Sequence, residues 1–104
     1  MASRCKRIYL VSAENDILEI AGFHAGHVGL ESARKVYQII RERIGQLQTF
    51  PLMGQLHPDQ ELAAQGYRKL VLTKTYVAIY KVMDGVVMIY RVVNGVTDYP
   101  KLLR

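Results

Sequence analysis

Basic and aromatic side chains are concentrated in the last third of the chain. The set is Tyr67, Arg68, Lys69, Lys74, Tyr76, Tyr80, Lys81, Tyr90, Arg91, Tyr99 and Lys101. Lysine and arginine can hold phosphate groups, and tyrosine rings can stack on unpaired bases. Tyrosine also fills sheet cores and lysine protects strand ends. For any single residue we favour this structural interpretation, but the set as a whole indicates an anionic partner.

Histidine and cysteine are residues of this chain that could ligate a metal ion. His24 and His27 are three residues apart, while Cys5 and His57 lie elsewhere in the chain. No carboxylate or second cysteine completes a set of ligands around them, so we expect no metal site and no cofactor. The chain has no phosphate-binding loop, no dinucleotide glycine motif and no nucleophile elbow.

Length and composition predict one small globular domain. The 104 residues correspond to a single domain, 1–104, and a hydrophobic content of 50% with 22% charged residues excludes an intrinsically disordered chain. No apolar run is long enough for a membrane-spanning helix. With one cysteine and no signal-peptide pattern, we expect a cytoplasmic location.

The positive charge is unevenly distributed. The formal net charge is +5. From Tyr67 onward only Asp84 and Asp98 oppose the lysines and arginines, so the excess lies in the C-terminal half. A small basic domain is typical of proteins that bind nucleic acid, an acidic protein or a membrane surface.

Two helices are predicted from apolar residues at steps of three and four. The first covers about residues 13–27, with Ser12 as its N-cap. The second carries the apolar series Ala33, Val36, Tyr37, Ile40, Ile44 and Leu47 and ends before Pro51. Because the link between them is short, the two helices should form an antiparallel hairpin.

Four strands are predicted from a period of two, at residues 6–11, 67–73, 76–82 and 86–93. One further helical turn is expected at 59–65, and Asp84-Gly85 predicts a hairpin turn. The fold class is therefore α+β, in two layers and in the order β-α-α-β-β-β. The helix hairpin packs on one face of a mostly antiparallel four-stranded sheet. If the first and last strands are neighbours, we expect them to run in opposite directions.

Both faces of the last two strands are apolar. On the first of them Tyr80 would point away from Ile79, and on the second Val92 would point away from Ile89 and Val93. One helix pair covers only one face, so a C-terminal tail, a second copy or another protein must cover the second. We take this as an argument for a protein partner.

A series of short motifs resembles a known family. Leu47-Gln48-Thr49-Phe50-Pro51-Leu52-Met53-Gly54 fits L-x-x-x-P-x-M-G, and it is followed by Tyr67-Arg68-Lys69-Leu70, by the strands from Tyr76 and Val86, and by Asp98-Tyr99. This series resembles the RelE/ParE superfamily of type II toxins, also called plasmid stabilisation proteins, over nearly the whole chain. The resemblance implies the same order of elements and an acidic antitoxin encoded beside the toxin.

The resemblance also supplies site residues. Arg68 matches the basic position that belongs to the cationic groove of nuclease members, and Tyr99 lies where those members often have a functional tyrosine. Arg68 and Tyr99 are therefore the catalytic candidates, and we expect Arg68→Ala to leave the fold nearly intact. The candidates for contact with nucleic acid or another target are Lys69, Lys74, Lys81, Arg91 and Lys101.

Three departures from the nuclease pattern bear on the activity. RelE-type nucleases usually have arginine where Val77 stands and a second lysine where Leu70 stands. Many also have His or Gly followed by Arg where this chain has Asn94-Gly95-Val96. RNA cleavage without a metal needs a group that activates the 2′-hydroxyl, cations and a proton donor. Among the histidines only His57 is a plausible participant.

We therefore predict a toxin that an acidic antitoxin neutralises. Its action would be ParE-like inhibition of DNA gyrase, or growth arrest without an intact nuclease site. The alternatives are a RelE-like endoribonuclease that cuts mRNA on the ribosome, and a degenerate toxin that only binds its partner. A homodimer remains open, and no membrane partner is expected.

Overall fold

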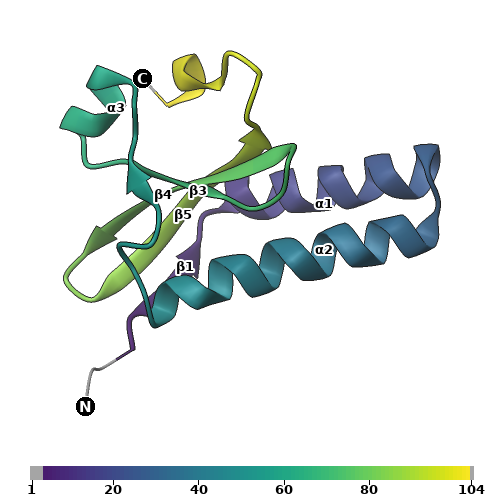
Figure 1. Cartoon of the computed structure of the whole chain (residues 1–104), viewed down its shortest axis with the longest axis horizontal. Coiled ribbons are helices and arrows are strands. Elements are labelled where there is room, and N and C mark those ends of the chain that lie inside the picture. The colour runs from purple at the N-terminus through teal and green to yellow at the C-terminus, as the bar shows by residue number, and fades with distance from the viewer. Residues whose placement is uncertain (1–3, 104) are drawn as a thin grey trace.

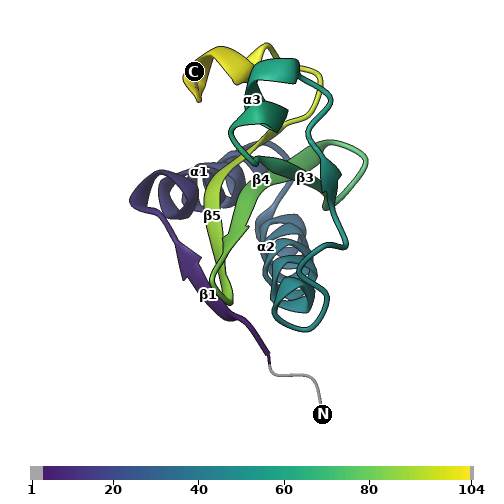
Figure 2. The same ribbon diagram turned by 90° about the vertical axis from the view of Figure 1, so that its left-hand side faces the viewer.

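The computed structural model describes residues 4–103 (Figure 1). A five-stranded sheet lies between a long helix hairpin and a smaller layer formed by α3 and the C-terminal segment (Figures 1 and 2). In chain order the elements are β1 (Lys6–Tyr9), α1 (Val11–His27), α2 (Leu30–Gly45), the 3-10 helix η1 (Gln46–Gln48), β2 (Gln55–Leu56), α3 (Gln60–Ala64), β3 (Arg68–Val71), β4 (Tyr76–Met83), β5 (Val86–Asn94) and the 3-10 helix η2 (Tyr99–Leu102).

The strand order is β1-β5-β4-β3-β2, and β1 runs parallel to β5. The predicted opposite direction is therefore wrong. α2 and η1 bring the chain back to the start of β1, where the Cys5 amide donates to the Gln48 carbonyl at 2.8 Å. The meander β3-β4-β5 therefore begins at the end of the sheet where β1 begins. Because its strands alternate in direction, its third strand, β5, runs parallel to β1. The prediction of four strands also missed β2, whose two residues are too few for a visible alternation.

The helices follow the predicted hairpin, with one correction at the start of α1. The helix begins at Val11 after Leu10, so Ser12 is not its N-cap. The Ser12 hydroxyl donates instead to the Tyr90 carbonyl at 2.8 Å and ties the first turn to β5. Gly29 links the helices with φ 143°, a conformation that favours glycine. The predicted third helical turn is confirmed, with Asp59 as its N-cap.

The main core lies between the sheet and the helix hairpin. Its buried residues on the strands are Leu70, Ala78, Tyr80, Val87, Ile89 and Val92, Leu72 follows β3, and its helix residues are Ala13, Ile17, Ile20, Val36, Ile40 and Ile44. Burial of this apolar area is the principal stabilisation of the fold.

A bulge at Tyr90 changes which face of β5 is buried. The pairing with β4 slips by one residue there, so Tyr90 is extra on β5. Val87, Ile89 and Val92 consequently all pack in the core beside the helices. The expectation that Val92 and Ile89 point to opposite faces is therefore wrong.

The second face of the sheet is covered by the chain itself. Val77, Ile79 and Val93 form a smaller core with Leu62 of α3 and Tyr99 of η2. In Figures 1 and 2, α3 and the C-terminal segment lie on the side of the sheet opposite the helix hairpin. Of the three predicted covers, the C-terminal tail is present, and α3 joins it. The apolar sheet face is therefore no argument for a partner.

No helix within residues 4–103 combines the length and the apolar character needed to cross a membrane.

Candidate functional site

The Arg68 side chain anchors a loop. Its Nε donates to the Gly54 carbonyl at 2.8 Å and its Nη2 to the Leu52 carbonyl at 3.4 Å. The Tyr80 hydroxyl donates to the Pro51 carbonyl at 2.8 Å and accepts from the Gly54 amide at 2.9 Å. These hydrogen bonds argue against the expectation that Arg68→Ala leaves the fold nearly intact, because the guanidinium satisfies backbone carbonyls.

Tyr99 is the second catalytic candidate, and it is buried beside His57. The Tyr99 hydroxyl lies 2.7 Å from His57 Nε2, and His57 Nδ1 accepts from the Asp59 amide at 3.0 Å. Neutral His57 must then carry its proton on Nε2 and donate it to Tyr99. This contact fastens the C-terminal segment to the loop before α3.

Both groups are held in their neutral forms. Burial raises the pKa of Tyr99, and the negative charge of Asp59 adds to that effect. Burial, together with the positive charge of Lys69, lowers the pKa of His57. Tyr99 is thus a poor base at neutral pH, and both His57 ring nitrogens are occupied.

The stability of the protein is expected to fall as the pH is lowered through 6.5 and below, in part because His57 must accept a proton. The pKa of His57 in the folded state lies below the value of 6.5 from which it is lowered. The stabilisation is therefore present above pH 6.5 and is lost as the pH falls through the folded-state pKa. Urea unfolding across this range should give a smaller pH slope for His57→Gln than for the wild type. Equal slopes would contradict a buried, neutral His57.

Arg68 and Tyr99 lie on opposite faces of the sheet. Arg68 pairs across the ladder with Tyr80, whose ring belongs to the core beside the helix hairpin. Tyr99 belongs to the core under α3. The structure therefore does not bring the two catalytic candidates together.

Lys81 lies above two tyrosine rings on the face that carries α3. Its Nζ is 4.3 Å from the centroid of Tyr67 and 5.3 Å from that of Tyr90. The two rings meet edge to face at 5.0 Å. Within residues 4–103 no carboxylate lies at ion-pair distance from Lys81, and the ring faces attract its ammonium group. Tyr67 is buried and has no face free for a base to stack on.

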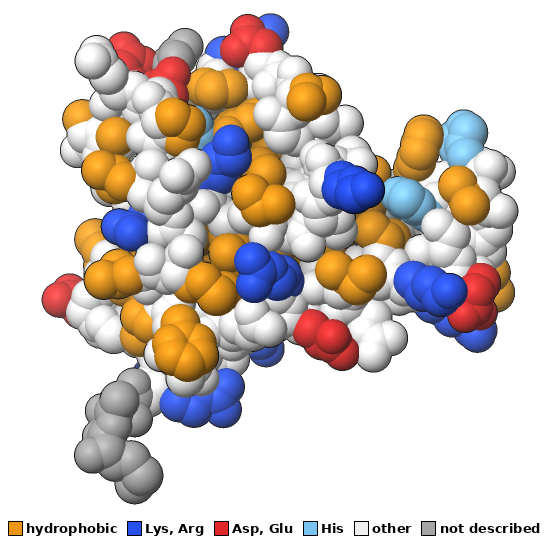
Figure 3. All heavy atoms as spheres, viewed as in Figure 1, with side chains coloured by type: hydrophobic (Ala, Val, Ile, Leu, Met, Phe, Trp, Pro, Cys, Tyr) orange, Lys and Arg blue, Asp and Glu red, His pale blue; other side chains and the backbone are white. Residues whose placement is uncertain are grey.

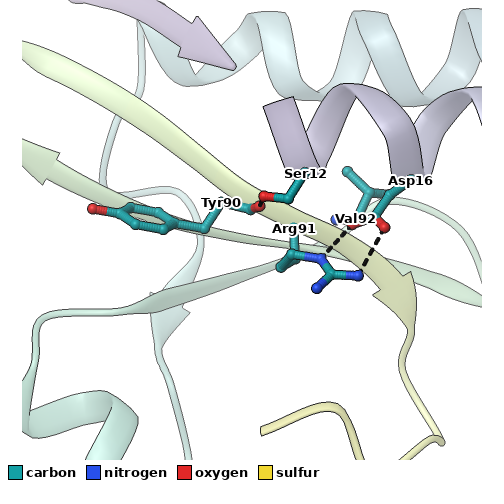
Figure 4. Close-up of polar contacts among 5 residues, drawn as sticks. All are labelled: Ser12, Asp16, Tyr90, Arg91 and Val92. Carbon is teal, nitrogen blue, oxygen red and sulfur yellow. Dashed lines mark hydrogen bonds and ion pairs between the residues drawn. The ribbon is translucent and has the colours of Figure 1, made fainter. Parts of the chain in front are cut away.

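Arg91 is committed to an internal ion pair (Figure 4). Its Nε and Nη2 donate to the Asp16 carboxylate at 2.7 and 2.9 Å, and the Val92 amide donates to the same carboxylate at 2.9 Å. The hydrogen bond to Asp16 raises the pKa of Arg91. Arg91 therefore locks α1 to β5, a role that the sequence prediction missed because no local pattern links residues so far apart.

The other predicted contact residues differ in their exposure and in whether they form an ion pair. Lys74 is exposed in the turn between β3 and β4, and Lys69 is half-buried on β3. Neither forms an ion pair within the described part of the chain. Lys101 is exposed, and its Nζ lies 3.8 Å from Asp98. Exposed pairs of this kind hold a side chain only weakly.

The histidines of α1 have structural contacts. His24 joins the two helices to β4, with Nδ1 3.1 Å from the Ser32 hydroxyl and Nε2 3.3 Å from the Tyr76 hydroxyl. His27 stacks on Phe23 at a centroid distance of 4.2 Å. Residues 4–103 hold no group of three or more His, Cys, Asp or Glu side chains suited to a metal ion.

The comparisons with known proteins agree on the class of fold. The structure resembles the chromosomal ParDE toxin-antitoxin system of P. aeruginosa, with a TM-score of 0.75, 23% identity and coverage of 89% of this chain and 98% of that one. It also resembles the RelBE2 toxin-antitoxin complex of Mycobacterium tuberculosis, with a TM-score of 0.65, 21% identity and coverage of 88% and 98%. For the E. coli DinJ-YafQ toxin-antitoxin complex the TM-score is 0.63, the identity 18% and the coverage 88% and 92%.

The sequence comparison specifies the family. Residues 8–99 match the ParE toxin of type II toxin-antitoxin systems, parDE. No curated protein matches the chain closely enough to count as a relative. The chain belongs to the ParE toxin family, within the RelE/ParE superfamily.

Proposed function

We propose that this ParE-family toxin arrests growth by inhibiting DNA gyrase and does not cut RNA. The observation that carries the proposal is that both candidate catalytic side chains already form hydrogen bonds within the fold. Arg68 anchors the loop around Gly54, and Tyr99 is a buried neutral phenol hydrogen-bonded to His57. Tyr99 would have to leave this hydrogen bond to act as a base, and Arg68 already uses Nε and Nη2 on the loop carbonyls.

The free cations are the proposed contacts with the target. Lys69, Lys74 and Lys81 have no ion-pair partner among residues 4–103. Lys69 on β3 pairs with Ile79, two residues from Lys81 on β4, whereas Lys74 lies in the turn at the other end of these two strands. Arg91 is less suited to this role than the sequence prediction supposed, because Asp16 neutralises it. Lys101 retains an exposed ammonium group.

An acidic antitoxin is the proposed partner. The formal net charge of +5 favours an acidic protein, and the solved structures that this fold resembles include toxin-antitoxin complexes. Gyrase and the ribosome are both cytoplasmic, so the proposal places the protein in the cytoplasm.

RelE-like cleavage of mRNA on the ribosome is the second candidate. Lys69 and Lys81 favour it, because both are unpaired cations beside Tyr67 and His57, and RNA cleavage requires cations at the phosphate. It would need His57 or Tyr99 to leave its present hydrogen bond.

The test measures both activities with the same purified protein. One arm follows mRNA on programmed ribosomes by primer extension, and the other follows supercoiling of relaxed plasmid by gyrase. We expect intact mRNA and reduced supercoiling. Lys74→Glu should weaken the effect on gyrase, while Lys35→Glu, an exposed lysine on α2, serves as the matched control. Codon-dependent cleavage by the wild-type protein would contradict the proposal.

A further inference from the structure

Exposed apolar side chains gather at one edge of the sheet, beside the end of α2. We call this surface the edge patch; its members are Phe50, Leu52, Met53 and Val71. Phe50 and Leu52 are 63% and 65% exposed. Figure 3 shows apolar side chains over the segment that follows α2 and over the neighbouring part of the sheet, with basic side chains among them.

The loop that carries most of the edge patch is held in place. Arg68 and Tyr80 together bond to the backbone of Pro51, Leu52 and Gly54. A loose loop could fold its apolar side chains inward, but this one is anchored with Phe50 and Leu52 directed to solvent. A preorganised apolar surface loses little entropy when a partner binds.

The neighbouring sheet edge is also open. β2 pairs with β3 only at Lys69 and Arg68, and within residues 4–103 no strand lies beside Val71 on that side. The Val71 carbonyl accepts from Arg43 Nε at 3.2 Å, and Arg43 Nη1 lies 3.7 Å from Met53 Sδ. Arg43 thus lies inside the edge patch and joins α2 to the strand edge.

The charge around the edge patch selects the chemistry of its partner. Arg43 lies within the patch, Lys69 is two residues before Val71, and Lys74 is three residues after it. None of these three cations has an acidic ion-pair partner in the described chain. A second copy would bring like charges together, whereas an acidic amphipathic segment satisfies both the apolar and the basic groups.

We propose that the edge patch is the surface on which the acidic antitoxin lays an amphipathic segment. Its apolar side chains cover Phe50, Leu52 and Val71, and its carboxylates face Arg43 and the two flanking lysines. The inference rests on the proposed function, which supplies the antitoxin. It adds where that protein binds and which side chains it must present.

The test uses the acidic protein encoded by the neighbouring reading frame, titrated calorimetrically into the full-length toxin. We expect the double variant Phe50→Asp/Leu52→Asp to raise Kd about 30-fold or more, the usual scale for central interface residues. Val28→Asp and Val96→Asp change side chains that are 69% and 92% exposed elsewhere and should leave Kd within about threefold. Thermal unfolding verifies that each variant is folded.

Each outcome decides between explanations. An unchanged Kd for the double variant, with tight binding by the wild type, overturns the edge patch while the proposed partner stands. No binding by the wild type overturns both this inference and the antitoxin part of the proposed function, but leaves the gyrase assay as a separate test. If sedimentation shows a dimer of the toxin that the double variant dissociates, the patch binds a second copy and the inference is wrong.

Discussion

Replacing Asp16 with alanine is expected to lower the free energy of unfolding by about 3 kcal/mol. The carboxylate is nearly buried and accepts three hydrogen bonds, two from Arg91 and one from the Val92 amide. Its loss leaves a charged guanidinium and a buried amide without their partner. Arg91 retains some contact with solvent, which places the estimate at the lower end of the range for broken buried pairs.

Thermal and urea unfolding measure this effect directly. For a domain of this size the midpoint should fall by more than about 10 °C. Asp98→Ala removes a carboxylate from the exposed pair with Lys101 and should change stability by less than about 0.5 kcal/mol. Equal effects of the two substitutions would show that the Asp16–Arg91 pair does not lock α1 to β5.

A second large effect is expected from Gly54→Ala, at about 3 kcal/mol of lost stability. A Cβ at this position would lie 2.7 Å from the Lys69 carbonyl oxygen and 2.7 Å from the Tyr80 hydroxyl. The backbone must therefore shift, at the cost of overpacking and of the hydrogen bond between Gly54 and Tyr80. The glycine of the L-x-x-x-P-x-M-G motif is explained by this close approach.

Gly22→Ala is a control substitution that is expected to change stability in the opposite direction. It lies inside α1, and a Cβ there would meet nothing within 4 Å. Gly22→Ala should therefore stabilise the protein by about 0.5–1 kcal/mol through helix propensity. Unfolding of both variants in urea compares them on one scale. If Gly54→Ala were neutral, the loop would be mobile, and the anchored surface behind the edge patch would not exist.

Local patterns predicted the elements whose signals lie within a few residues. Ala33, Val36, Ile40 and Ile44 of α2 and Leu47 of η1 are buried as expected, whereas Tyr37 of the same predicted series is 39% exposed. The Asp84-Gly85 turn is confirmed, with φ values of 52° and 74° that suit a tight hairpin. Both signals are local, because a helix face and a two-residue turn are each specified by neighbours in sequence.

Long-range features could not be predicted from the sequence. Ser12 has the residue type of an N-cap, but a carbonyl 78 residues away offers it a better partner. The bulge at Tyr90 depends on how β4 and β5 fit together. Arg68 has the charge of a phosphate ligand, and only the folded loop shows that carbonyl oxygens already occupy it. In each case a tertiary contact overrides a local preference.

The candidate site shows the same difference between local features, which the sequence predicts, and long-range contacts, which it does not. Lys69, Lys74 and Lys81 form no ion pair within residues 4–103, and their contact with a target stays a prediction. Residue type alone did not separate these from Arg91, whose neutralisation requires Asp16 on α1. Tyr99 lies in the expected segment, but its burial beside His57 depends on how the C-terminal segment packs.

The gyrase supercoiling arm tests the central claim most directly. Relaxed plasmid, gyrase and ATP are incubated with increasing amounts of the purified toxin, and the products are separated by agarose electrophoresis. The account predicts a dose-dependent loss of supercoiled product, restored by the acidic protein from the neighbouring reading frame. Full supercoiling at a large molar excess of folded toxin, together with cleaved mRNA on programmed ribosomes, would contradict it.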